Sequence, residues 1–404
     1  MKIGFTGPYC TANFGDWAML VNNIYDFGDN EFFIFTYSDS FPHSAIKHYM
    51  GNRIITMVEV QIMDRELSLQ NATPLDCLLS IKNMGQLTTI IKELDVLVVS
   101  GGGWLNDRWC GRLKHFYRVM APLLIAAQKG VPVRFMAQGI GPIIETKEMM
   151  RGFFNFFGGN TVVAVRDKYC SASYLNEFFS EGIVKFLPDD LSVINEELFE
   201  SNNAQMYTGG GQQPYFVLIT NEKPDLLRNR IGDFSSFCRE MKTRYGLDVL
   251  LLSFDLVWHG DEQVSLLNAN IDGNKSVLIG EKRFLPIGDV ISYIKNAEFL
   301  ITERYHASVV AMQTHTPFFV KLDSGNSVYA YNKAHGVLDE FLKSIEYDER
   351  DFLANDWDHL FALVMENYKG IVERQNRIFS EDAYERNCLQ MRSIRKNYIA
   401  EFIK

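Results

Sequence analysis

One short stretch of the chain places a permanent cation beside a side chain that titrates near neutral pH. Arg304, Tyr305 and His306 follow the apolar run of residues 299–301 and precede a small-residue segment typical of a helix. The apolar run predicts a buried strand, and ligands of open α/β sheets bind at the carboxyl ends of strands. A guanidinium, an imidazole and the N–H groups of a helix start suit an anionic substrate that undergoes proton transfer. A surface arginine and a histidine at the edge of the core are the alternative, and this stretch alone weighs the two equally.

Similar junctions between strands and turns occur elsewhere. Arg166 is a second cation at the end of a predicted strand, residues 162–165. Glycines directly after a strand let the backbone approach a ligand closely, and three predicted strands lead into such turns. Their candidate cleft residues are Asn13, Gly15, Asp16, Gly101, Gly102, Gly103 and Gln138. A helix N-cap for Asp16 and a tight strand-to-helix turn for the three consecutive glycines are the structural alternatives.

The elements that position these residues alternate between strand and helix along most of the chain. Apolar runs such as residues 95–100, 215–220 and 248–253 predict buried parallel strands, each followed by a helical segment. The helix after residues 215–220 is expected at residues 234–245. This rhythm predicts an α/β fold with two doubly wound Rossmann-like domains facing a cleft. We expect the domains to be residues 1–200 and 215–375, joined by a polar linker at 201–214 and followed by a helical tail at 376–404. Residues 39–93 give no clear pattern.

Composition narrows the class of protein. The 404 residues carry a net charge of −10, which argues against broad binding to nucleic acid. No apolar run approaches the roughly 20 residues of a spanning helix, and the six scattered cysteines lack metal-ligand spacing, as expected in a reducing compartment. We therefore expect a cytoplasmic protein with no required metal. The basic residues of the tail predict a solvated helix face, with docking to an anionic membrane surface as the alternative; they are Arg386, Arg392, Arg395 and Lys396.

Six short motifs, taken in order, carry a resemblance to a known family. They are Asn13-x-Gly15-Asp16, Ser100-Gly-Gly-Gly103, Gln138-Gly-Ile-Gly-Pro142, Val165-Arg-Asp167, Pro188-Asp189 and Arg304-Tyr-His306. Over about residues 1–345 the chain resembles the polysaccharide pyruvyl transferase family, and Tyr331-Asn-Lys333 loosely resembles a further segment of that family. The resemblance implies a glycosyltransferase-B-like pair of Rossmann domains.

The resemblance also implies a reaction. The enolpyruvyl group of phosphoenolpyruvate is transferred onto a sugar of a polysaccharide or a lipid-linked glycan precursor, forming a pyruvate ketal and releasing phosphate. His306 is then the expected catalytic residue, protonating the methylene carbon. Arg166, Arg304 and Tyr305 are the expected donor-binding residues, and the C-terminal domain is the expected donor side of the cleft. The glycine turns, the Asn13–Asp16 loop and Gln138 are expected near the acceptor, phosphoenolpyruvate is the only co-substrate, and a lipid-linked acceptor suggests peripheral contact with the inner membrane face.

Two other functions remain open from the sequence. A glycosyltransferase of the same two-domain shape could use a nucleotide-sugar donor, with Glu303 binding the ribose. A non-enzymatic glycan-binding protein with a vestigial site is the third reading, and the presence of both arginines and the histidine argues against it.

Overall fold

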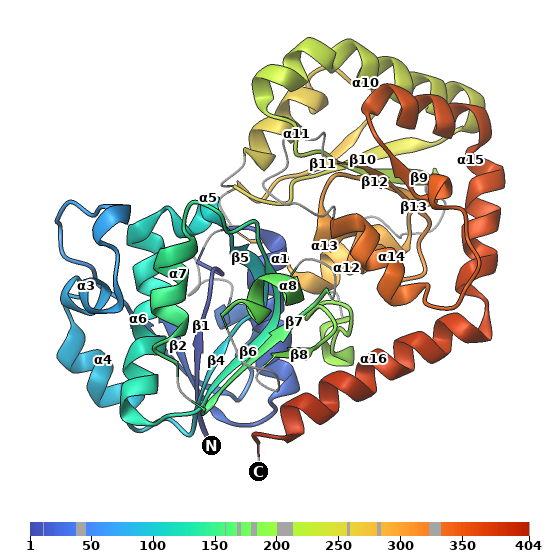
Figure 1. The fold of residues 1–404 in the computed structure, drawn as a ribbon. Coiled ribbons are helices and arrows are strands. Elements are labelled where there is room, and N and C mark those ends of the chain that lie inside the picture. The colour runs from blue at the N-terminus through green and yellow to red at the C-terminus, as the bar shows by residue number, and fades with distance from the viewer. Residues whose placement is uncertain are drawn as a thin grey trace.

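Two parallel β-sheets, each with helices on both faces, make up the N-terminal and C-terminal halves of the chain (Figure 1). This arrangement confirms the α/β class with two doubly wound domains. The computed structural model describes residues 1–10, 12–37, 46–157, 159–167, 171–178, 184–199, 213–256, 259–280, 284–322 and 333–403.

The N-terminal sheet is built from strands β1 (Lys2–Thr6), β2 (Glu31–Thr36), β3 (Ile54–Glu59), β4 (Val96–Val99), β5 (Gly102–Leu105), β6 (Val133–Ile140), β7 (Thr161–Val165) and β8 (Val184–Phe186). Their order is β3-β2-β1-β4-β6-β7-β8, with β5 paired to β6. The helices are α1 (Phe14–Asp26), α3 (Pro74–Leu79), α4 (Met84–Ile91), α5 (Asp107–Cys110), α6 (Leu113–Lys129), α7 (Lys147–Phe154) and α8 (Ser171–Asn176), with 3-10 turns η1 (Leu69–Asn71) and η2 (Glu196–Phe199). All four residues of β4 are buried, as expected for a central strand covered on both faces.

The C-terminal sheet is built from β9 (Tyr215–Ile219), β10 (Asp248–Leu252), β11 (Lys275–Val277), β12 (Leu300–Thr302), β13 (Phe318–Lys321) and β14 (Leu353–Ala354). Their order is β11-β10-β9-β12-β13-β14. The helices are α10 (Pro224–Tyr245), α11 (Gly260–Asn268), α12 (Ile287–Lys295), α13 (Tyr305–Gln313), α14 (Lys333–Phe341), α15 (Trp357–Phe379) and α16 (Asp382–Ala400), with the 3-10 turn η4 (Glu349–Asp351).

The direction of chain progression reverses at one strand in each sheet. β1 pairs with β2 on one side and β4 on the other, and β9 pairs in the same way with β10 and β12. The crevice outside the carboxyl ends of strands at such a switch point is where doubly wound sheets bind ligands. The segments that directly follow β1, β4 and β12 contain the candidate residues Asn13–Asp16, Gly101–Gly103 and Arg304–His306.

Some boundaries differ from the sequence expectation. Helix α10 begins at Pro224, whereas the apolar spacing predicted a start at residue 234, because the first turns of the helix bury few side chains. Gly102 and Gly103, expected in a turn, belong to β5. Residues 46–93, left without assignment, contain β3, α3 and α4. Residues 201–212 of the expected linker, together with Tyr331 and Asn332, lie outside the described residues.

The two domains are joined by direct contact beside the site. The backbone N–H of Phe14 donates to the carbonyl oxygen of Phe254 at 2.9 Å, and the N–H of Leu256 donates to that of Ala12 at 3.2 Å. The rings of Phe14 and Phe254 lie 4.7 Å apart. A single hydrophobic core runs from the N-terminal sheet through α1 to α12 and α13 of the C-terminal domain, so the start of α1 is held against the C-terminal domain.

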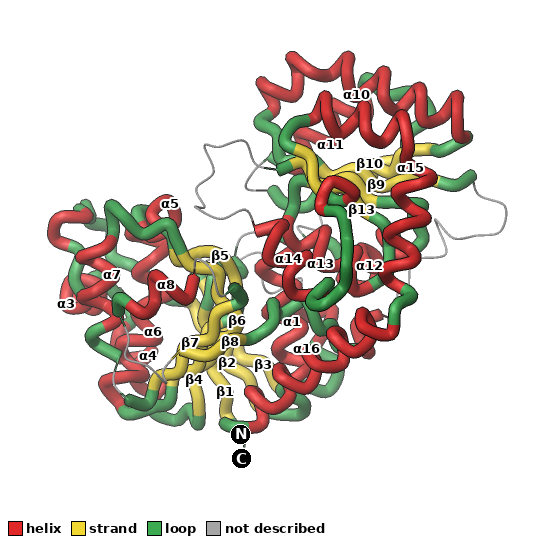
Figure 2. The backbone as a smooth tube through the Cα atoms, turned by 45° about the vertical axis from the view of Figure 1, so that its right-hand side comes forward, coloured by secondary structure: helices red, strands yellow, loops and turns green. Residues whose placement is uncertain are grey.

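The last helix returns to the first domain. α16 leaves the C-terminal domain and runs along the N-terminal sheet, which brings the two ends of the chain to the same side of the molecule (Figure 2). The hydroxyl of Tyr398 donates to the carbonyl of Phe135 in β6 at 2.6 Å. Arg395, expected on a solvated face, is buried, because Asp26 and Asp190 bind its guanidinium. Within the described part of the chain, no helix is long and apolar enough to cross a membrane.

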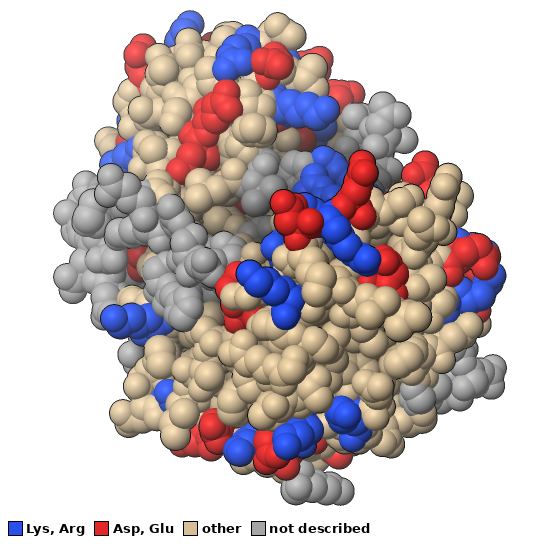
Figure 3. All heavy atoms as spheres, turned by 90° about the vertical axis from the view of Figure 1, so that its left-hand side faces the viewer, with Lys and Arg blue, Asp and Glu red and all other residues tan. Residues whose placement is uncertain are grey.

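Charge is mixed on the side of the molecule that carries α3 and α4. On the visible part of this face, acidic and basic side chains lie beside one another in small groups (Figure 3). The N-terminal half also carries a broad area of described residues without charged side chains (Figure 3). Two exposed apolar side chains of α3, Leu75 and Leu79, belong to this half. Interspersed charges of both signs on this face do not favour broad binding to nucleic acid phosphates.

Candidate active site

His306 lies at the boundary between the two domains. It occupies the first turn of α13, directly after β12, and its ring packs on the backbone of Gly15 at the start of α1. A Cβ atom built on Gly15 would lie only 1.8 Å from Nδ1 of His306. Burial lowers the pKa of His306 to about 3, although Asp189, with Oδ2 3.9 Å from Nε2, acts in the opposite direction. His306 is therefore neutral at physiological pH and can accept a proton.

Arg166 is fixed beside His306 by three contacts. Its Nη1 lies 2.6 Å from Oδ2 of the fully buried Asp189. Its guanidinium carbon lies 4.2 Å from the ring centroid of Tyr305, which is a cation–π distance. A Cβ atom on Gly139 would come within 2.7 Å of Arg166 Nη2, so this glycine leaves room for the guanidinium. Burial opposes ionisation of Asp189, but the charge of Arg166, together with the hydrogen bonds from Arg166 and from the N–H of Leu191, holds the pKa of Asp189 below its usual value.

Arg304 is the residue before α13 and is anchored to the neighbouring strand end. Its backbone N–H donates to Oγ1 of Thr302 at 2.8 Å. Its guanidinium forms an ion pair with the buried carboxylate of Asp255, which follows β10. Asp255 in turn forms an isolated antiparallel bridge with Asn13, whose side chain caps α1 by accepting the N–H of Gly15 at 3.1 Å. Asp255 therefore contacts both Arg304 and the loop before α1.

Arg166, Arg304 and His306 each have a buried polar atom without a hydrogen-bond partner in the part of the chain that the structure describes. Nη2 of Arg166, Nε of Arg304 and Nε2 of His306 are buried and make no hydrogen bond within the described residues. A buried donor without a partner costs about 1–3 kcal/mol. An anionic ligand could accept hydrogen bonds from the two guanidinium donors, and the neutral imidazole could accept a proton from a group beside that ligand.

Lys333 and Glu340, both on α14, join the site without having been proposed as site residues. Burial, followed by the positive charge of Arg166, lowers the pKa of Lys333 well below its usual value, while Asp16 and Asp189 oppose this shift. Oε2 of Glu340 accepts a hydrogen bond from Ser192 at 3.2 Å, and burial raises the pKa of Glu340 well above its usual value. The Tyr331-Asn-Lys333 motif was the available signal for Lys333, whereas no motif marked Glu340.

Asp16 lies on the first turn of α1, next to Gly15. A Cβ atom on Gly102 would lie 3.7 Å from its Oδ1, so the carboxylate faces the glycine turn after β4. Burial raises the pKa of Asp16 to about 7, against the charges of Lys333 and Arg166. The first-turn position fits the helix-start alternative, but Asn13 is the capping residue.

The glycine run contacts the site on one side and a structural ion pair on the other. The N–H of Gly101 donates to Oδ2 of Asp190 at 3.0 Å, and Asp190 Oδ1 accepts from Arg395 at 2.8 Å. Gly102 has φ +148°, a backbone conformation that residues other than glycine rarely adopt. The carbonyl of Gly103 accepts a hydrogen bond from the Asn106 side chain at 2.7 Å.

Gln138 lies in the interior of the sheet, where it pairs with Gly102 of β5 and its carbonyl accepts the N–H of Arg166 at 3.0 Å, but its side chain is used within the sheet. Its Nε2 donates to the carbonyls of Ser100 and Met136, and its Oε1 accepts from Nε1 of Trp104 at 2.9 Å. The side chain thereby ties β6 to the turn after β4. Within the same motif it is Gly139 that borders Arg166.

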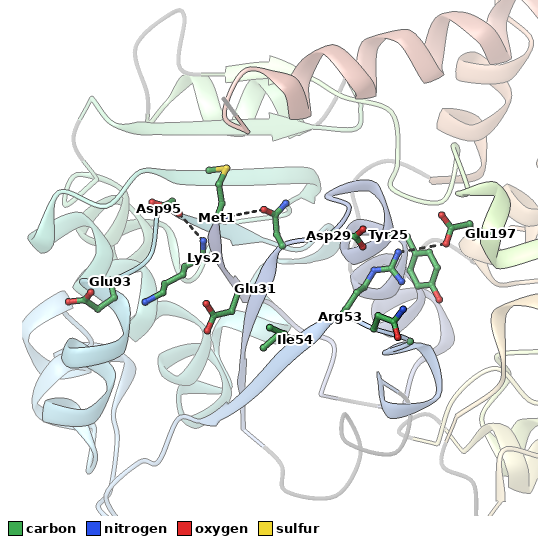
Figure 4. A pocket seen from close by; sticks show the side chains of 13 residues that line it. Met1, Lys2, Tyr25, Asp29, Glu31, Arg53, Ile54, Glu93, Asp95 and Glu197 are labelled. Carbon is green, nitrogen blue, oxygen red and sulfur yellow. Dashed lines mark hydrogen bonds and ion pairs between the residues drawn. The ribbon is translucent and has the colours of Figure 1, made fainter.

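A polar pocket opens at the opposite edge of the N-terminal sheet (Figure 4). It is lined by residues at the amino ends of strands, including Lys2 and Glu31, and by Arg53, which lies over the ring of Tyr25 and 3.7 Å from Glu197. This edge is remote from the carboxyl ends where the candidate residues meet. In the described ranges no group of three or more His, Cys, Asp or Glu side chains is arranged to hold a metal ion.

Comparison with protein families finds one match that covers most of the chain. A family model described as polysaccharide pyruvyl transferase matches residues 20–321. The matched range contains the glycine run, Arg166, Asp189 and Arg304–His306, whereas Asn13–Asp16 and Lys333 lie just outside it. No curated protein sequence is significantly similar to the chain.

Several solved structures share the fold. A Staphylococcus aureus MnaA–UDP structure aligns over 99% of this chain and 96% of its own, with a TM-score of 0.57 and 14% identity. A Neisseria meningitidis UDP-GlcNAc 2-epimerase bound to UDP-GlcNAc aligns over 100% and 99%, with a TM-score of 0.57 and 14% identity. Anabaena HepE in complex with UDP and glucose aligns over 99% and 98%, with a TM-score of 0.57 and 11% identity. At these identities the likeness shows the two-domain fold alone.

Proposed function

The chain belongs to the polysaccharide pyruvyl transferase family, and we propose that it transfers the enolpyruvyl group of phosphoenolpyruvate onto two hydroxyls of a sugar. The products are a pyruvate ketal on a polysaccharide or lipid-linked glycan precursor and free phosphate. The observation that carries this proposal is the convergence of Arg166, Arg304 and neutral His306 at the domain boundary.

Phosphoenolpyruvate, the proposed donor, supplies negative charges that the two arginines can bind. Phosphoenolpyruvate carries a phosphate and a carboxylate, and a guanidinium binds either group in bidentate fashion. The unused Nη2 of Arg166 and Nε of Arg304 are the donors available for it. Burial and Arg166 lower the pKa of Lys333, and a trianion that binds nearby opposes this shift, since opposite charges favour ionisation.

His306 suits the role of a base better than that of an acid. Its pKa of about 3, set by burial, leaves the imidazole neutral in the free protein, and the negative charge of the bound donor raises that pKa, so the ring can accept the proton of the sugar hydroxyl that attacks C2 of the donor. The expectation that His306 protonates the methylene carbon requires an imidazolium, which burial disfavours. Charge develops on the donor next to Arg166 and Arg304, where fixed cations stabilise it.

The acceptor is proposed to bind on the N-terminal side. Gly15 borders His306 there and Asp16 faces Gly102, and backbone without side chains gives a sugar ring close access. Positioned acid–base groups and cations account for the chemistry without a metal ion. The type of sugar is left to a panel of acceptors.

A glycosyltransferase with a nucleotide-sugar donor is the competing function. The UDP complexes among the structural neighbours favour it at the level of fold only. Glu303, the residue considered for a ribose contact, already accepts hydrogen bonds from Thr220 at 2.8 Å and from Lys321 at 2.9 Å. This engagement disfavours a nucleotide site that depends on Glu303.

Thermal unfolding with added ligand separates the two donors. A ligand that binds only the folded state adds about 2.7 kcal/mol of stability at 100 times its dissociation constant. We expect phosphoenolpyruvate to raise Tm and UDP-sugars to leave it unchanged, with Arg166→Gln abolishing the shift and the exposed Arg350→Gln keeping it. A shift with UDP-sugars and none with phosphoenolpyruvate would replace the proposed donor.

A further inference from the structure

We propose that Asp16 is the acid that delivers a proton to the methylene carbon of phosphoenolpyruvate, with His306 as the partner base. The inference rests on the function proposed above. It assigns a direct catalytic role to a residue that was expected near the acceptor.

The position of Asp16 gives the first argument. It follows Gly15, on whose backbone the ring of His306 packs, and its Oδ1 faces Gly102 across the turn after β4. Two residues on the same turn of α1 therefore border the base on one side and the glycine turn on the other. Among the described residues, no group donates a hydrogen bond to the Asp16 carboxylate, so it is not committed to a structural role.

The charged groups around Asp16 come from four other elements. Arg166 follows β7, Asp189 follows β8, Asp255 follows β10 and Lys333 begins α14. Burial, reinforced by Asp255 and Asp189 and opposed by Lys333 and Arg166, raises its pKa to about 7. A bound trianion raises it further, because nearby negative charge favours the neutral form. Asp16 therefore holds a proton in the donor complex.

The division of roles follows from opposite shifts within one site. Burial disfavours the charged form of both groups, which leaves Asp16 protonated and His306 neutral. Pairs of titratable groups whose pKa values are displaced in this way identify an acid and a base. Asp16 has a proton to give and His306 has a lone pair to receive one.

The two half-reactions balance with these residues. In the first, Asp16 protonates C3, the C2=C3 π bond breaks, the first sugar oxygen bonds to C2, and His306 takes the hydroxyl proton. In the second, the bond between C2 and the phosphate oxygen breaks and the second sugar oxygen bonds to C2. The carboxylate of Asp16 takes the second hydroxyl proton while His306 gives its proton to the departing phosphate. Both residues return to their starting states.

Asp16→Asn removes the proton and keeps the shape of the side chain. We expect acceptor-dependent phosphate release to fall by roughly 10²–10⁴-fold, the range of a positioned acid. Phosphoenolpyruvate affinity should hold or improve, because the variant removes a negative charge near a trianion. Asp16→Glu keeps a carboxyl and should exceed Asp16→Asn in rate. Asp29→Asn, an exposed carboxylate beyond the other end of α1, is the matched control.

Calorimetry of phosphoenolpyruvate binding gives a second readout that needs no acceptor. At pH 8 the free Asp16 is mostly ionised, so binding should take up protons, and titrations in buffers of different ionisation enthalpy measure that uptake. We expect wild type and Asp29→Asn to share the same uptake and Asp16→Asn to take up fewer protons, since only the uptake at Lys333 remains in that variant. Equal uptake in wild type and Asp16→Asn, or wild-type turnover by a folded Asp16→Asn, overturns the assignment while leaving the donor intact. Absence of phosphoenolpyruvate binding by wild type overturns the proposed function, and this inference with it.

Discussion

The imidazole of His306 packs on the backbone of Gly15 across the domain boundary, so closely that a Cβ at Gly15 would lie 1.8 Å from Nδ1. The helical conformation of Gly15 suits any residue, so the need for glycine here is one of space. Because the imidazole belongs to one domain and the glycine that it packs on belongs to the other, the candidate site is complete only when the domains are in contact.

Gly15→Ala should therefore displace His306 from the site. We expect phosphate release to fall by about two orders of magnitude, comparable with loss of a positioned base. Gly232→Ala is the matched control, because Gly232 lies within α10 with no heavy atom within 4 Å of an added Cβ. A Gly15→Ala enzyme with normal turnover would show that His306 does not act from this position.

Arg304→Lys tests the bidentate contact to the donor. Lysine keeps the charge but presents it as a point, so it cannot replace the planar fork that serves both Asp255 and an anion. We expect most of the activity to be lost, measured as kcat/KM for phosphoenolpyruvate. Arg350→Lys, at an exposed ion pair with Asp348, should behave as wild type. Near-normal kinetics in Arg304→Lys would remove Arg304 from the donor site.

Arg395→Met should destabilise the fold. The substitution leaves the buried Asp190 without its cation, and breaking such a pair costs about 3–5 kcal/mol of the free energy of unfolding. Arg386→Met changes an exposed arginine on the same helix and should stay within about 0.5 kcal/mol of wild type in urea unfolding. Equal stability of the two variants would contradict the account of α16 as a buried anchor.

His306 should make stability depend on pH. Its pKa is lowered by burial to about 3 in the folded state, so below the unfolded value only the unfolded chain gains the proton. The contribution is complete above about pH 6.5 and falls by about 2 kcal/mol on going to pH 5. The difference in unfolding free energy between wild type and His306→Gln should shrink by this amount over that interval. A difference that does not vary with pH would mean that His306 is solvated.

Removal of divalent metal should leave activity intact. In the described residues the acid, the base and the cations are all side chains, and no cluster of metal-ligand residues is present. Phosphate release should be the same before and after dialysis against EDTA. Loss of turnover that added Mg²⁺ or Mn²⁺ restores would show that a metal takes part.

Much of the fold follows from local patterns. Buried parallel strands such as β4 and β9 are continuous apolar runs. The end of α6 is marked by Gly130, a residue type that favours helix ends. The start of α10 was missed because residues 224–233 are mostly exposed, which leaves a weak periodic pattern.

Candidate site residues could be identified from the sequence where they come shortly after a predicted strand. Arg166, Arg304 and His306 are brought together because the carboxyl ends of parallel strands meet. Arg395 could not be placed from sequence, since its partners Asp26 and Asp190 lie more than 200 positions away. For Gln138, only the three-dimensional contacts show that its amide is consumed within the sheet and that the neighbouring Gly139 borders the site.

The most direct test of the account is phosphate release from phosphoenolpyruvate, with and without galactosyl, mannosyl and N-acetylhexosaminyl acceptors, beside His306→Ala. We predict release that depends on an acceptor and is lost in the variant, together with an acceptor product heavier by the mass of a pyruvate ketal. Acceptor-independent release that survives in His306→Ala, or transfer from a UDP-sugar with no phosphoenolpyruvate binding, would contradict it.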